Sequence, residues 1–218
     1  MISRQLPSLF LRSKTTIHLL QIHCLILKTA LDFDPLSVSG FISSACSISV
    51  DFARVFFDRL PISPPLFSWN SIIRQYAKSP QPIEAVKLFS GLLRTGIRPD
   101  NFTYPFVLKA CGRCSMLEEG GAVHSLIFKT GLYSDRYIGN TLLRMYAACS
   151  AIGFSRQVFD EMTYRDVVSW SSIIAGYVAC NLPLNALRMF QNIKLENVQP
   201  NSVTLELLSS RCMPSVGI

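Results

Sequence analysis

The sequence lacks the features of several common protein classes. No run of apolar residues reaches the roughly 18 that span a membrane. One apolar stretch, Ile17–Leu31, is interrupted by His18, Gln21, His23 and Lys28. Neither a glycine-rich phosphate loop nor a nucleophile elbow is present. We therefore expect no membrane association and no catalytic residue.

Acidic residues are missing from the first 31 positions. This stretch contains Arg4, Arg12, Lys14 and Lys28, so +4 of the net charge of +7 lies there and the remaining 187 residues carry only +3. A basic, acid-free segment that contains serine is typical of an organellar transit peptide, and we assign residues 1–15 to such a segment. The alternative is that this stretch is the disordered or degenerate first helix of the first repeat.

The cysteines do not form a disulfide pattern. Seven of them are scattered, mostly inside helical patterns, where they resemble small buried hydrophobic residues. Cys111 and Cys114 have the spacing of a zinc or redox pair, but no second pair and no paired histidine motif accompanies them. We expect no metal and no cofactor.

What the chain has instead is a repeat at an offset of 101 residues. Matching residues include Trp69 and Trp170, Tyr76 and Tyr177, and His23 and His124. Such a period is typical of an array of stacked units rather than of one globular core. The function of an array lies along its surface.

The long period divides into units of 35, 35 and 31 residues. In the first, Trp69, Ile72, Ile73, Tyr76 and Ala77 follow the spacing of one helical face, and a second such face follows from position 85. The segment 79–82 contains two prolines that interrupt the helix, while Gly96 and Pro99 end the second one. Each unit is therefore predicted to be a helical hairpin.

A hairpin alone cannot bury both of its apolar stripes, whereas stacked hairpins can. The hydrophobic share of 49% fits this demand. We predict an all-α fold, a right-handed α-solenoid of helix-turn-helix repeats. The aromatic residues expected in the core between repeats are Trp69, Tyr76, Phe89, Trp170 and Phe190.

The motifs of these units resemble the pentatricopeptide repeat. The matching segments are Ser68–Ile73 early in the unit, Ala85–Phe89 in the second helix and Gly96–Asp100 at its end. The alternation of lengths is similar to the plant subclass built of P, L and S units. On that basis the array covers residues 16–212: partial L 16–34, S 35–65, P 66–100, L 101–135, S 136–166, P 167–201 and partial L 202–212, followed by a tail, 213–218.

The resemblance implies sequence-specific binding of single-stranded organellar RNA, most often in C-to-U editing. A deaminase of that kind needs an H-x-E and a P-C-x-x-C motif. Every histidine here is followed two residues later by leucine, and no proline precedes Cys111. We therefore expect a recognition module without enzymatic activity, cut short inside a repeat, with editing cofactor proteins or a deaminase supplied in trans.

In the family, the fifth and last residues of a unit select the base. The pairs are Asn70 with Asp100, Asn140 with Asp166, and Ser171 with Asn201. Short polar side chains can meet a base edge while neighbouring side chains sandwich the base. The resemblance implies U for the Asn/Asp pairs and A for Ser/Asn, which gives the register U, any base, U, A. The alternative role of these residues is helix capping.

Two other pairs receive no base. Proline cannot donate a hydrogen bond, so Pro105 with Asp135 is unassigned, as is Ser39 with Pro65.

Two further functions remain open. One is a protein-binding scaffold of the tetratricopeptide kind, which should carry clustered Lys and Arg on successive first helices. We find such residues, Arg74 and Lys78, in only one unit. The other is a fragment without independent activity. The expected location is the mitochondrion, with the chloroplast as the alternative.

Overall fold

The computed structural model describes residues 2–196, 198–202 and 204–206, and within these residues every regular element is a helix. The expected partial L unit from position 202 lies mostly outside the described residues, and the tail 213–218 lies wholly outside them. The contacts divide the chain into two compact units, up to Phe106 and from Val107 onward. We describe each unit by itself.

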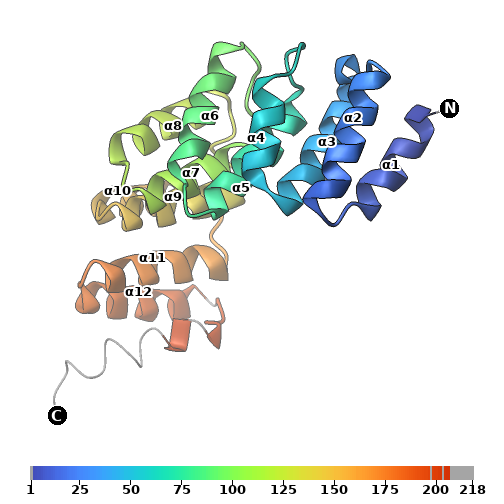
Figure 1. Ribbon diagram of the computed structural model, residues 1–218. Coiled ribbons are helices and arrows are strands. Elements are labelled where there is room, and N and C mark those ends of the chain that lie inside the picture. Colours follow the sequence, from blue (N-terminus) through green and yellow to red (C-terminus); the bar gives the residue numbers. More distant parts are fainter. Residues whose placement is uncertain (1, 197, 203, 207–218) are drawn as a thin grey trace. The chain divides into compact units, whose positions relative to one another are not determined.

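The first unit contains α1 to α6 and the start of α7. Their bounds are α1 Ile2–Arg12, α2 Thr16–Lys28, the 3-10 helix η1 Leu31–Phe33, α3 Pro35–Ile48, α4 Val50–Asp58, α5 Leu66–Lys78, α6 Ile83–Arg94 and α7 Tyr104–Arg113. Helix α3 packs on α1, α2, α4 and α5, and α5 packs on α6. These are antiparallel hairpins joined by short turns (Figure 1).

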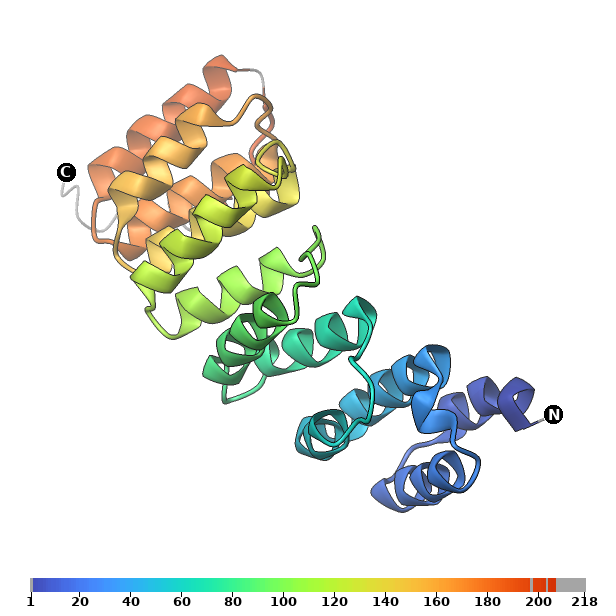
Figure 2. The same cartoon turned by 90° about the horizontal axis from the view of Figure 1, so that it is seen from above.

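The second unit continues from the rest of α7 to α12. The bounds of its helices are α8 Leu117–Lys129, α9 Arg136–Ala148, α10 Ile152–Glu161, α11 Val167–Ala179 and α12 Pro183–Leu195. Helix α9 packs on α8, α10 and α11, and α11 packs on α12. Seen from above, each of these helices lies beside its hairpin partner (Figure 2). The predicted all-helical fold of hairpin repeats is therefore confirmed.

Turn chemistry ends the helices where the sequence predicted. Gly96 follows α6 with a φ of 76°, the left-handed conformation that glycine adopts without steric cost. Helix α5 ends at Lys78, immediately before the segment that contains Pro80 and Pro82. The ends of α5 and α6 are therefore set by glycine and proline residues in the adjoining turns.

The repeated aromatic residues form the core between helices. Trp69 stands edge-on to Phe57 at 4.6 Å between ring centroids, and Trp170 stands edge-on to Phe159 at 4.8 Å. Both indoles are buried. The expected core position of Phe190 holds only in part, because this ring is half-buried and the Lys194 ammonium lies 4.7 Å from its centroid.

The start of the chain is folded onto the first unit. Helix α1 contains Pro7 but continues through it, Leu6 is fully buried, and Phe10 contacts the ring of Phe41. The Ser44 hydroxyl donates to the Phe10 carbonyl at 3.1 Å. This packing favours the alternative that the stretch serves as the first helix of a repeat, in addition to any role in targeting.

Candidate nucleic-acid interface

The first pair of predicted base-reading residues is joined by hydrogen bonds. Asn70, on α5, donates from Nδ2 to Oδ1 of Asp100 at 3.1 Å, although 30 residues separate the two. Asp100 also accepts from the backbone N–H groups of Phe102 and Thr103, which it caps. Thr103 completes the group, with its hydroxyl 2.7 Å from Asn70 Oδ1. Because α6 runs back along α5, the fifth and last positions of this unit lie together.

The second pair is also brought together, but more loosely. Asn140 lies on α9 and donates from Nδ2 to Oδ1 of Asp166 at 3.4 Å. Asn140 is only 7% exposed, and its Oδ1 atom has no hydrogen-bond partner within the described residues. Asp166 caps α11 through the N–H groups of Val168 and Ser169.

Asp166 is held in its charged form. Desolvation opposes ionisation, but hydrogen bonds from Ser169, Asn140 and Val168 outweigh it and hold the pKa of Asp166 below its ordinary value. At neutral pH this carboxylate is therefore acceptor-only. Oδ1 accepts the capping hydrogen bonds and the bond from Asn140, while Oδ2 lies 3.4 Å from Arg136 Nη1.

The third pair is not joined directly. The Ser171 hydroxyl donates to the Val167 carbonyl one turn back at 2.7 Å, and among the described residues no hydrogen bond links it to Asn201. Asn201 Oδ1 accepts from the backbone N–H and the hydroxyl of Thr204 at 2.9 and 2.8 Å. Its amide nitrogen is not part of this cap. A serine side chain is too short to span the gap that the two asparagines bridge.

Bulky apolar side chains stand exposed near the start of the first helix in successive units, and the apolar pattern of the sequence did not predict them. They occupy the second position of each expected unit, off the buried stripe: Leu36, Phe67, Phe102, Tyr137 and Val168. Phe67 is 58% exposed, Phe102 66% and Tyr137 64%. A large apolar group kept in water at the same place in successive units is a surface on which a planar base can stack. The signal in the sequence is a bulky residue that recurs with the unit length.

Basic side chains also recur on the first helices. Arg74 and Lys78 on α5 have counterparts at the same unit positions in Lys109 and Arg113 on α7, and Arg144 repeats the first of these positions on α9. All five are exposed. The prediction that only one unit carries Lys and Arg on its first helix was wrong. It rested on the motif of one unit and left out the same positions in the next units.

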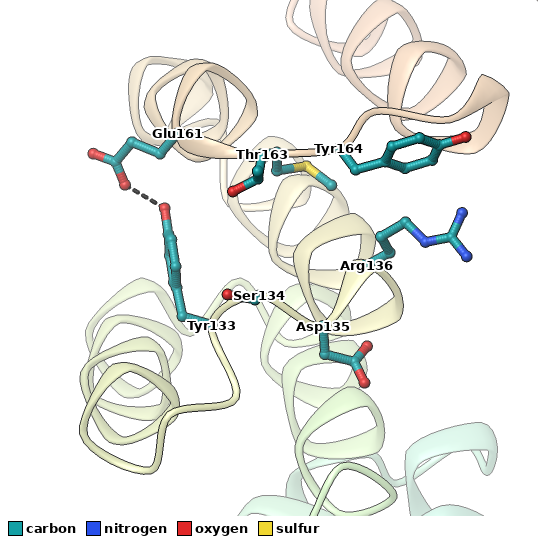
Figure 3. A pocket seen from close by; sticks show the side chains of 8 residues that line it. Tyr133, Ser134, Asp135, Arg136, Glu161, Thr163 and Tyr164 are labelled. Atoms are coloured by element: carbon teal, nitrogen blue, oxygen red, sulfur yellow. Dashed lines mark hydrogen bonds between the residues drawn. The ribbon is translucent and has the colours of Figure 1, made fainter.

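A small cavity opens between the start of α9 and the residues at and after the end of α10 (Figure 3). It measures about 20 Å³, room for one water molecule. The Arg136 guanidinium lies 5.0 Å from the ring centroid of Tyr164, and its Nη1 is 3.4 Å from Asp166 Oδ2. On the far side the Tyr133 hydroxyl donates to Glu161. The Arg136 guanidinium therefore lies next to Asp166 of the second predicted pair.

The unassigned residues have structural roles. Asp135 caps α9, and the Ser39 hydroxyl lies 3.2 Å from that of Ser68.

His124 Nδ1 lies 2.9 Å from the Tyr146 hydroxyl, and burial lowers the pKa of this imidazole. Burial likewise raises the pKa of the Cys111 thiol to about 12. Among the described residues no group of three or more His, Cys, Asp or Glu side chains is placed to hold a metal ion.

Two repeat profiles match this chain. The PPR repeat family matches residues 64–113 and the PPR repeat matches residues 168–198. Pentatricopeptide repeat-containing protein At3g22690 of Arabidopsis thaliana is 36% identical over 211 residues, which is 94% of this chain and 25% of that protein. The chain belongs to the pentatricopeptide repeat family.

Two further pentatricopeptide repeat relatives, both from Arabidopsis thaliana, carry a location in their names. The chloroplastic protein At2g02980 is 37% identical and the mitochondrial protein At3g53360 is 38% identical, over 75% and 66% of this chain. The chain spans 27% and 19% of their lengths.

A solved pentatricopeptide repeat structure supports the fold. The crystal structure of PPR10 from maize matches 96% of this chain and 36% of its own chain with a TM-score of 0.66 and 16% identity. At that identity the likeness shows the repeat fold alone. None of the helices formed by the described residues is long and apolar enough to cross a membrane.

Proposed function

We propose that this pentatricopeptide repeat chain binds single-stranded RNA, one base per unit, through its fifth and last residues. The observation that carries the proposal is the Asn70–Asp100 and Asn140–Asp166 contact, each flanked by an exposed aromatic side chain at the second position. Together these groups offer hydrogen bonds to a base edge and an apolar face for stacking. The units are the P, L and S units of the plant subclass.

The proposed role is organellar RNA processing, with C-to-U editing as the specific process and the catalytic step supplied in trans. Editing cofactor proteins are the proposed partners besides RNA. The names of two relatives place those proteins in the chloroplast and the mitochondrion. For this chain we propose the mitochondrion. A fluorescent reporter fused to residues 1–31 should enter an organelle because of its basic, acid-free composition, and a diffuse cytosolic signal contradicts this.

The basic residues on the first helices provide the phosphate contacts. We expect the triple variant Arg74→Gln/Lys109→Gln/Arg144→Gln to bind a UNUA-containing RNA about tenfold more weakly at low salt. Three lost contacts should also reduce the slope of log K against log salt by about 2, since each contact to a single strand contributes roughly 0.7. Filter binding at about 50 to 200 mM KCl measures both quantities.

A matched control separates the effect of losing first-helix basic residues from the effect of lowering the net charge. The triple variant Arg94→Gln/Lys129→Gln/Arg188→Gln removes three exposed charges from second helices α6, α8 and α12. It should leave affinity nearly unchanged. Equal losses in both triple variants contradict the assignment of the first helices to phosphate.

One observation favours a second function. Exposed basic residues on α5, α7 and α9 are the feature expected of a scaffold that clamps an acidic peptide carboxylate. The same purified chain distinguishes the two functions. Under the RNA proposal, an acidic peptide at millimolar concentration leaves RNA bound, while under the scaffold alternative it binds and RNA does not.

A further inference from the structure

The two Asn/Asp pairs consist of the same residue types but form different hydrogen bonds. At the first pair the Thr103 Oγ1 atom lies 2.7 Å from Asn70 Oδ1 and 2.8 Å from Asp100 Oδ1. A hydroxyl has one proton to donate. Asp100 Oδ1 already accepts from two backbone N–H groups, so the proton of Thr103 is best used on the amide oxygen of Asn70. Both ends of the Asn70 amide are then bonded inside the protein.

At the second pair the amide oxygen has no such partner. Ser169 occupies the position equivalent to Thr103, but both hydrogen bonds of its hydroxyl among the described residues go to Asp166. It donates to Oδ1 at 3.1 Å and accepts from the Asp166 N–H at 3.3 Å. Asn140 is held by one long bond of 3.4 Å, and its buried oxygen is unpaired within the described residues. An unpaired buried oxygen is unfavourable, and turning the amide outward to a base relieves it.

We propose that the hydroxyl at the third position of the following unit sets how strictly an Asn/Asp pair reads its base, with Thr103 weakening the reading by Asn70. The inference rests on the proposed RNA-binding function. Uracil presents an N3–H donor beside an O4 acceptor, and cytosine presents the reverse. Pairing with both groups of uracil requires the amide oxygen and an amide N–H of asparagine. At Asn70 the base must share that oxygen with Thr103, whereas at Asn140 no described residue bonds to the oxygen.

The wild-type chain tests this without any substitution. Affinities are measured for UNUA, CNUA and UNCA placed in one unstructured RNA. Replacing the third base by C should reduce affinity more than replacing the first, by roughly two- to tenfold, the range of one net hydrogen bond. Equal losses at the two positions overturn the inference. No preference for U at either position overturns the proposed reading pairs themselves.

A substitution tests the hydroxyl directly. Thr103→Val keeps the shape of this buried side chain and removes the proton, so the preference for U over C at the first position should rise roughly two- to tenfold. Thr103→Ser retains the hydroxyl and should leave the preference as in the wild type. Thermal melting checks that both variants are folded. If Thr103→Val does not fold, the comparison of the two positions in the wild-type chain still tests the inference.

Ser169→Ala is the matched control at the second pair. Its hydroxyl bonds to Asp166, and among the described residues no hydrogen bond links it to Asn140, so its removal should not raise the preference for U over C at the third position. If Thr103→Val does not change the preference for U over C at the first position, the role of Thr103 is overturned. An equal rise of this preference at the third position in Ser169→Ala overturns it as well.

Discussion

Replacing Trp170 with alanine is expected to lower the free energy of unfolding by about 3–5 kcal/mol, the usual cost of removing a large aromatic side chain from a core. The indole is only 3% exposed and packs edge-on against Phe159 of the preceding hairpin. Its N–H has no hydrogen-bond partner within the described residues, so the loss comes from packing and the cavity that remains. Urea unfolding followed by circular dichroism measures the change.

The control for this substitution is Leu184→Ala on α12. Leu184 is 66% exposed, so its loss should cost little, as is usual for surface positions. Because neighbouring hairpins stabilise one another in a repeat array, the Trp170 variant should also broaden the transition. If the two variants unfold at the same urea concentration, Trp170 does not hold the second unit together.

The hairpins could be predicted from the sequence because their causes are local. A helical face of apolar residues is encoded within a few turns, and the prolines at 80 and 82 and Gly96 act within one turn. The burial of Trp69 and Trp170 followed from the same spacing. Such features need no knowledge of how one hairpin meets the next.

The contacts of the candidate site could be predicted only in part. The family resemblance paired Asn70 with Asp100, but the Thr103 hydroxyl that joins them is 33 residues from Asn70, and its partner depends on the exact stacking of hairpins. Periodicity does not distinguish Thr103 from Ser169, although only the first bonds to an asparagine. Exposed side chains such as Phe67 were not predicted, because apolar residues at helical spacing indicate burial and this ring lies off the buried stripe.

Base reading by the Val167–Asn201 unit can be tested by one change, Asn201→Asp. Oδ1 of Asn201 accepts both hydrogen bonds of the Thr204 cap, which leaves the amide nitrogen as the donor that can face a base. Adenine offers an acceptor at N1, whereas guanine offers N–H donors on the same edge. Aspartate keeps the cap oxygen and exchanges the donor for an acceptor. Asn and Asp cap helices about equally well, so folding should be unaffected.

The corresponding control is Asn192→Asp. This residue is exposed on α12, and the change adds the same negative charge away from the pair. It should weaken binding to both RNAs alike through electrostatics and leave their order unchanged.

The decisive measurement is competition between UNUA and UNUG sequences, placed in the same unstructured RNA, for the wild-type chain and for Asn201→Asp. A correct base contact is worth on the order of 1–3 kcal/mol, so the wild type should prefer UNUA and the variant UNUG. If both proteins rank the two RNAs in the same order, Ser171 and Asn201 do not read the base, and the account of one base per unit is contradicted.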